Sequence, residues 1–195
     1  RRLARRKPVV VFAPGRTRRH DHLGVRGGLG HAPDEAVDAL FRQAGVMVVH
    51  NRGDMIDIAT IAARQPLPRG PRVRIVTNSL TLSHQMMQKM DSVGLFHDPE
   101  PELLGADARA AAFAQTARAA LADSRYDSVV CAAVNAFDRG TEEVILALEQ
   151  VAVEGVKPLV GVFLDFHPAL GSNGEPDSRG SLPRFDSSVD AIQAL

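Results

Sequence analysis

The sequence predicts an α/β protein of two lobes, each built around a parallel sheet. Short apolar runs rich in β-branched residues, such as residues 8–12 and 128–134, alternate with segments whose apolar residues recur at helical spacing. These runs are continuously apolar, which is typical of strands that helices cover on both faces. A segment rich in proline, glycine and arginine, residues 65–72, separates two sets of such elements. The chain of 195 residues is long enough for two small domains.

Four elements form the predicted first lobe. Residues 8–12 are a strand that ends before Pro14-Gly15, and a long polar loop follows. Pro33 suits the first position of a helix, whose apolar residues fall at i, i+3, i+4 and i+7 counted from Val37. Residues 46–49 read as the next strand, and a second helix stops before Pro66. We place the boundary near Gly70, which gives lobes of residues 1–69 and 70–195.

The second lobe alternates strands with helices, which indicates a parallel sheet. The expected elements are strand 73–76, helix 80–93, helix 106–122, strand 128–134, helix 141–153, strand 159–164, and a short strand 182–185 before a final helix. Right-handed crossovers place helices on both faces of such a sheet. Ligands then bind beyond the carboxyl ends of the strands, so the topology predicts the functional edge.

Composition excludes several classes of protein. The formal net charge is +0, so the molecule as a whole has no field that would collect nucleic acid or a membrane surface. The single cysteine, Cys131, lies in an apolar run and reads as buried packing, which fits a reducing compartment. No stretch approaches the roughly 18 apolar residues of a membrane span. We therefore expect a cytoplasmic protein, and the basic start, typical of the last turn of a helix, suggests a chain cut from a longer one.

Three stretches, read in order, carry a family resemblance. They are residues 5–16, residues 38–49 with 63–79, and ARAALADSRYDSVVCAAV with the later VKPLVGVFL and LPRFDSSVDAIQAL. They resemble ADP-forming acyl-CoA synthetases, relatives of succinyl-CoA synthetase that also occur fused to lysine acetyltransferases. The resemblance implies two flavodoxin-like lobes. In the family the PVVVF strand comes late in its lobe, so the first lobe is expected to be incomplete at its N-terminus and to leave apolar sheet surface uncovered.

The resemblance also locates the family's phosphohistidine, which shuttles a phosphoryl group between two sites. Counting back without a gap from the well-matched residues 44–46 places Arg26 at that position. A guanidinium is always protonated and cannot act as the nucleophile. His31 lies five residues further on and could serve if the loop is shortened and re-registered.

Further signatures of the family are altered here. Its glycine-rich phosphate loop after a Thr-Asn motif is matched by Thr77, Asn78 and Ser79, but no glycine follows them. The family lysine is matched by Ala13, and its Asn-Pro-Val-Asp motif only weakly by residues 100–104. Four arginines among the glycines of the first loop could still grip a phosphate or a CoA diphosphate by charge-assisted hydrogen bonds. They are Arg16, Arg18, Arg19 and Arg26.

Other polar residues favour ordinary interpretations. His20, Asp21 and His22 could ligate a metal, but flanking arginines oppose a cation, so we interpret them as a solvated loop and predict no metal site. Asp165 and His167 follow a predicted strand without any nucleophile, which favours a loop anchor.

These observations predict a degenerate, non-catalytic acyl-CoA synthetase-like module within a larger synthetase or acetyltransferase protein. It would bind or sense a CoA thioester or a nucleotide, or mediate assembly. Its ligands would be CoA, acyl-CoA, ATP or ADP. Its partners would be upstream CoA-binding and ATP-grasp domains, on the same or another chain, in a homo-oligomer or larger assembly. The alternatives are an active phosphoryl-transfer part of an acyl-CoA ligase that uses His31, and a purely structural interaction domain.

Overall fold

The chain divides into two compact units, residues 1–59 and 60–195. A computed structural model describes residues 4, 7–14, 34–134, 140–164 and 180–195. Arg16, Arg18, Arg19, Arg26, His31, the 20–22 cluster, Asp165 and His167 lie outside these residues.

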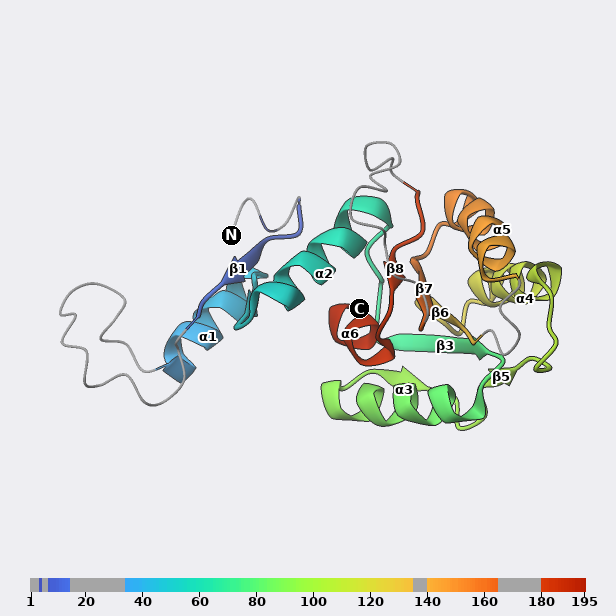
Figure 1. Cartoon of the computed structure of the whole chain (residues 1–195). Helices are drawn as coiled ribbons and strands as arrows, with labels where there is room; N and C mark the ends of the chain where they lie inside the picture. The colour runs from blue at the N-terminus through green and yellow to red at the C-terminus, as the bar shows by residue number, and fades with distance from the viewer. Residues whose placement is uncertain (1–3, 5–6, 15–33, 135–139, 165–179) are drawn as a thin grey trace. The chain divides into compact units, whose positions relative to one another are not determined.

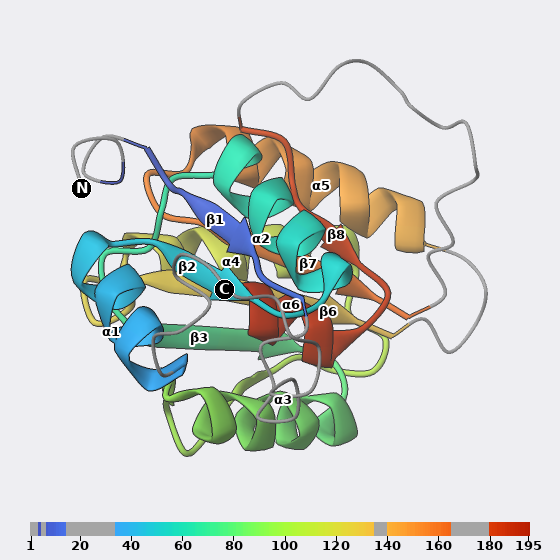
Figure 2. The ribbon, with the colours of Figure 1, turned by 90° about the vertical axis from the view of Figure 1, so that its left-hand side faces the viewer.

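Unit 1 contains a strand, a helix, a second strand and the start of a second helix, as the sequence predicts. The elements are β1 (Val10–Phe12), α1 (Asp34–Ala44), β2 (Met47–Val49) and α2 (Arg52–Arg64). The two strands pair in parallel, with Val10 opposite Met47 and Phe12 opposite Val49 (Figure 2). Gly45, with φ of 74°, ends α1 in the left-handed region that glycine tolerates. Val37 and Val49 are the buried apolar residues of this unit.

The small sheet of unit 1 exposes apolar side chains. Phe12 is 40% exposed and Met47 is 37% exposed, although each lies on a strand. Full burial of an apolar side chain stabilises a fold by about 1.5–3 kcal/mol, and these partly exposed side chains contribute less than that to the stability of unit 1. The expectation of an uncovered apolar sheet surface stays a prediction, which concerns these side chains.

Unit 2 is built on a fully parallel sheet. Its strands are β3 (Arg72–Thr77), β4 (Phe96–His97), β5 (Glu102–Leu103), β6 (Ser128–Ala133), β7 (Leu159–Phe163) and β8 (Arg184–Phe185). Their order is β4-β3-β6-β7-β8, and β5 pairs with β3 on the same side as β4. Every residue of β6 and β7 is buried, as the continuous apolar runs predict. Cys131 is fully buried on β6.

Helices cover both faces of this sheet. They are α3 (Leu80–Val93), α4 (Ala110–Ala122), α5 (Thr141–Glu154) and α6 (Ser188–Ala194). The helices α4 and α5 pack together over one face, and α3 packs with α6 over the other (Figure 1). Side chains alternate along a strand. Val129 and Cys131 therefore join the α4–α5 core, and the intervening residues of β6 face away from it.

The end of α2 belongs to unit 2 and not to an exposed linker. Gln65, directly after the helix, is only 5% exposed. Its side-chain amide donates to the Ser181 carbonyl at 2.8 Å and accepts from the Leu159 backbone N–H at 3.3 Å. These bonds explain why the compact units divide before residue 60, whereas the sequence boundary was placed near Gly70.

Two short strands were not predicted, and one helix starts later than expected. The strands β4 and β5 have two residues each, which is too few to show a periodic pattern of apolar residues. The helix expected from residue 106 begins at Ala110, since residues 105–109 make a turn in which the Ala108 N–H donates to the Gly105 carbonyl. No helix within the described ranges is long and apolar enough to cross a membrane.

Replacement of Gln65 by methionine should destabilise unit 2. The change keeps the side-chain length but leaves the buried Leu159 N–H and the partly buried Ser181 carbonyl without their partner, at a cost of about 1–3 kcal/mol. Urea unfolding can be followed by the fluorescence of Tyr126, because the chain has one tyrosine and no tryptophan. The control is Gln115→Met, at an exposed position of α4. Equal unfolding midpoints for the two variants would contradict the assigned role.

Candidate functional site

A pocket of about 420 Å³ opens at the carboxyl edge of the unit 2 sheet, where the topology predicts a ligand site. It lies beyond the ends of β3 and β6, and its rim includes the turn before α4 and the start of α5. The lining residues are Asn78, Ala106, Asp107, Ala108, Arg109, Ala110, Phe113, Ala133, Val134, Gly140, Thr141, Glu143 and Val144.

Two helix N-termini meet at this pocket. Arg109 precedes α4 and Gly140 precedes α5, and neither provides a side-chain cap for the first N–H groups of its helix. Gly140 has φ of 118°, a conformation that other residues rarely adopt. Uncapped N–H groups and the helix dipole both favour a negatively charged ligand. The backbone therefore gives the pocket a preference for anions.

The side chains of the pocket are mixed in charge. Arg109 adds one cation, whereas Asp107 and Glu143 add two carboxylates. Thr141 contributes a hydroxyl group at the start of α5. The floor is apolar, because Phe113, Ala133 and Val144 line the pocket and are at most 9% exposed. Such a pocket suits a ligand with one anionic end and one apolar part.

Asn78 joins the two strands beneath the pocket. Its side-chain amide donates to the Val134 carbonyl at 2.9 Å, and its oxygen accepts from the Val134 N–H at the same distance. The bonds clamp the end of β3 to the end of β6. Asn78 is the one residue of the predicted anion-binding set 77–79 that lines the pocket.

Thr77 and Ser79 use their hydroxyl groups within their own turn. Thr77 is fully buried, and its Oγ1 accepts from the Ser79 N–H at 3.1 Å. Ser79 is the N-cap of α3, and its Oγ accepts from the Leu82 N–H at 3.3 Å. The serine hydroxyl thus occupies a helix N-terminus that a glycine-rich loop would leave open for phosphate.

The sequence analysis missed Arg109, Thr141 and Glu143 as site residues. Arg109 directly precedes α4, and Thr141 and Glu143 lie in the first turn of α5. The topology predicts a site at this edge of the sheet. No motif marked the residues themselves.

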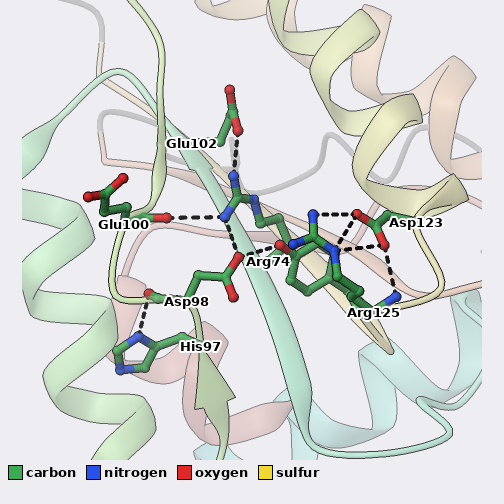
Figure 3. A network of polar contacts seen from close by, with 8 residues as sticks. Arg74, His97, Asp98, Glu100, Glu102, Asp123 and Arg125 are labelled. Atoms are coloured by element: carbon green, nitrogen blue, oxygen red, sulfur yellow. Dashed lines mark hydrogen bonds and ion pairs between the residues drawn. The ribbon is translucent and has the colours of Figure 1, made fainter.

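A network of ion pairs and hydrogen bonds joins β3 to the segment that leads from β4 to β5 (Figure 3). Arg74, on β3, donates to Asp98 at 2.7 Å, to the Glu100 carbonyl at 3.1 Å, and to Glu102. Tyr126, which is 5% exposed, donates its hydroxyl to Asp98. Burial, and then the hydrogen bond to Asp98, raise the pKa of Tyr126 above 10.0. Burial likewise raises the pKa of the Cys131 thiol, which fits its interpretation as packing.

Comparison with known proteins places part of this chain beside a described family. Residues 1–62 match the family model described as succinyl-CoA ligase like flavodoxin domain. An ADP-forming acetate–CoA ligase II of Archaeoglobus fulgidus is 35% identical over 75 residues, which cover 36% of this chain and 10% of the relative. The alpha subunit of the Pyrococcus furiosus enzyme is 32% identical over 84 residues, 40% of this chain and 17% of the subunit. This chain resembles part of an ADP-forming acyl-CoA ligase.

Solved structures share the fold of nearly the whole chain. A protein of Pyrococcus horikoshii OT3 superposes with a TM-score of 0.70 and 23% identity, over 99% of this chain and 46% of that one. The dinucleotide forming acetyl-coenzyme A synthetase 1 of Ca. Korarchaeum cryptofilum gives 0.73 and 16% identity, over 99% and 47%. The predicted α/β fold is confirmed. The chain spans less than half the length of these structures, and its aligned stretches cover a smaller share of the curated relatives.

The raised pKa of Tyr126 predicts how stability changes in alkali. A folded-state pKa above the unfolded value contributes stability below about pH 10 that is lost as pH rises through the folded pKa. The near-ultraviolet absorbance of phenolate should therefore rise at higher pH in the folded protein than in urea. Asp98→Asn should bring the two titrations closer together without making them equal, because burial remains. Titration of the folded protein at or below the pH of the unfolded chain would contradict the packing of Tyr126.

Proposed function

We propose that the chain is a synthetase-derived module whose function is to bind a CoA thioester or a nucleotide within a larger synthetase or acetyltransferase assembly. The observation that carries the proposal is the pocket at the carboxyl edge of unit 2, which combines the starts of two helices, whose N-cap residues Arg109 and Gly140 provide no side-chain cap, with an apolar floor. An inorganic anion can bind at the helix N-termini but gains nothing from these two features together, because it has no apolar part to cover the floor. A thioester or a nucleotide uses both.

The comparisons support this class of ligand. The named relatives are ADP-forming CoA ligases, and the Korarchaeum synthetase has been solved in complex with phosphate and ADP. Upstream CoA-binding and ATP-grasp domains, on this or another polypeptide, would complete such an assembly.

The described lining residues favour binding over chemistry. They include no histidine, cysteine or lysine, the usual nucleophiles and bases of group transfer. Thr141 and Glu143 are two residues apart on a helix, a spacing at which side chains do not face each other. A hydroxyl group activated by that carboxylate is therefore not built into the pocket.

A panel of CoA, acetyl-CoA, ATP, ADP and inorganic phosphate tests the proposal by thermal unfolding. A ligand at a hundred times its Kd stabilises the folded state by about 2.7 kcal/mol, which is readily measured. We expect acetyl-CoA, CoA or a nucleotide to raise the Tm more than phosphate does. A panel without any shift would instead favour a purely structural interaction domain.

Two neighbouring glutamates provide a matched pair for locating the site. Glu143 lines the pocket, whereas Glu142 stands in the same helical turn outside the lining. Glu143→Gln should tighten binding of an anionic ligand by about two- to fivefold. The change removes a negative charge that repels the ligand, and solvent and salt partly screen that repulsion. Glu142→Gln should change affinity less. The expected result is a gain in affinity, which poor folding of the variant cannot produce. An equal effect of the two changes would count against this pocket as the binding site.

The alternative function, phosphoryl transfer through His31, has a distinct signature. It predicts acid-labile phosphohistidine after incubation with labelled ATP or acetyl phosphate, and loss of the label in His31→Ala. His84→Ala, an exposed position on α3, is the control that should keep the label. We expect the wild-type chain to remain unlabelled, and a label that His31→Ala abolishes would establish the alternative.

A further inference from the structure

The wall of the pocket before α4 has few buried contacts of its own. Between β4 and α4 the chain makes only the two-residue strand β5, and Gly105, Ala106, Asp107 and Arg109 are all exposed. Leu104 and Ala108 are the exceptions, since both pack against the core of unit 2, and the Leu104 N–H donates to the Thr77 carbonyl at 2.8 Å. A segment with so little buried apolar surface opens locally at low free-energy cost unless polar contacts hold it.

Arg74, on β3 next to the edge strands β4 and β5, supplies those contacts. Its side chain is 15% exposed, and its two terminal nitrogens donate to three groups of the segment that leads to the wall. The acceptors are Asp98, the Glu100 carbonyl and Glu102, the last of which is on β5 (Figure 3). Glu102 stands four residues before Ala106, the first lining residue of the wall. One guanidinium thus fixes the approach to the pocket at three points.

The far end of α4 meets the same network. Tyr126, in the connection from α4 to β6, donates its hydroxyl to Asp98. Its ring lies under two guanidinium groups, with Arg74 Cζ 5.4 Å and Arg125 Cζ 5.2 Å from the ring centroid. Asp123 in turn accepts from Arg125. The chain on either side of the pocket wall and α4 therefore converges on Arg74.

We propose that Arg74 is a positioning residue, which holds residues 98–109 in place and so sets the shape and affinity of the pocket without touching its ligand. The part of this inference that concerns affinity rests on the proposed function. The part that concerns the wall does not. Arg74 is absent from the lining, so its replacement can change affinity through the wall or through the loss of one positive charge, and Arg74→Lys, which keeps the charge, separates the two.

The test compares Arg74→Met and Arg74→Lys with Arg118→Met. Methionine keeps much of the apolar stem and removes all donors, lysine keeps the charge but not the fork, and Arg118 is an exposed arginine of α4 paired with Glu154. Amide hydrogen exchange of the ligand-free proteins measures the wall directly. In Arg74→Met the Leu104 and Ala108 amides should exchange at least tenfold faster, while those of β6 should be unchanged. Lysine should restore part of the protection, and Arg118→Met should match the wild type.

Affinity is measured for CoA, acetyl-CoA, ADP and inorganic phosphate. Each probe that binds the wild type should bind Arg74→Met at least fivefold more weakly and Arg74→Lys with intermediate affinity. Unchanged exchange at Leu104 and Ala108 overturns the inference, and so does faster exchange with unchanged affinity.

If no probe binds the wild type, the proposed function fails, and the exchange rates alone decide whether Arg74 holds the wall. Should Arg74→Met fail to fold, Glu102→Gln takes its place with the same expectations at smaller size, because it removes the negative charge of one exposed partner of Arg74.

Discussion

The parallel pairing of β3 with β6, from Val73 opposite Ser128 to Thr77 opposite Ala132, is the interaction on which the rest of unit 2 depends. One flank of β3 carries β4 and β5, and the other carries β6 with the remaining strands. Because the strands are parallel, both end at the same edge, where the Asn78 amide bonds to the Val134 backbone in both directions. The pocket exists because this clamp brings the starts of α4 and α5 to one place. Arg74, on the same strand, then orders the segment that closes one side.

The polar groups near the sheet edge divide into those used by the fold and those available to a ligand. The Thr77 hydroxyl, the Ser79 hydroxyl and the Asn78 amide all have partners within the chain. A ligand at α3 would have to displace the serine cap, which is worth about 1 kcal/mol in helices generally. At the starts of α4 and α5 the N-cap residues, Arg109 and Gly140, make no side-chain cap bond that a ligand would have to displace. A sequence without glycines directly after Thr77-Asn78 is thus compatible with a binding site at two other helices of the same edge.

Much of this fold could be predicted from the sequence, because its strands are buried on both faces and read as continuous apolar runs. Residues 128–134 and 159–164 predicted β6 and β7 within a residue. The two-residue strands β4 and β5 could not be found, since they exist through pairing with β3 and not through a pattern of their own. Gln65 was assigned to a linker because proline follows it, yet its amide bonds bury it in unit 2. The edge that holds the site followed from topology, whereas Arg109 and Glu143 could not be chosen among many exposed charges without coordinates.

The charges of the pocket limit which anions it can select. One arginine faces two carboxylates, so the side chains by themselves give no net attraction for an anion, and the preference comes from backbone N–H groups. Those groups act over a single helical turn and are weak when exposed to solvent, so a small anion that contacts nothing else gains little there. A ligand that also covers Phe113 and Val144 gains from apolar burial at about 25 cal/mol per Å². Because the polar contacts are weak, phosphate alone should bind this pocket poorly. A thioester or a nucleotide should bind better, since burial of its apolar part can supply most of the affinity.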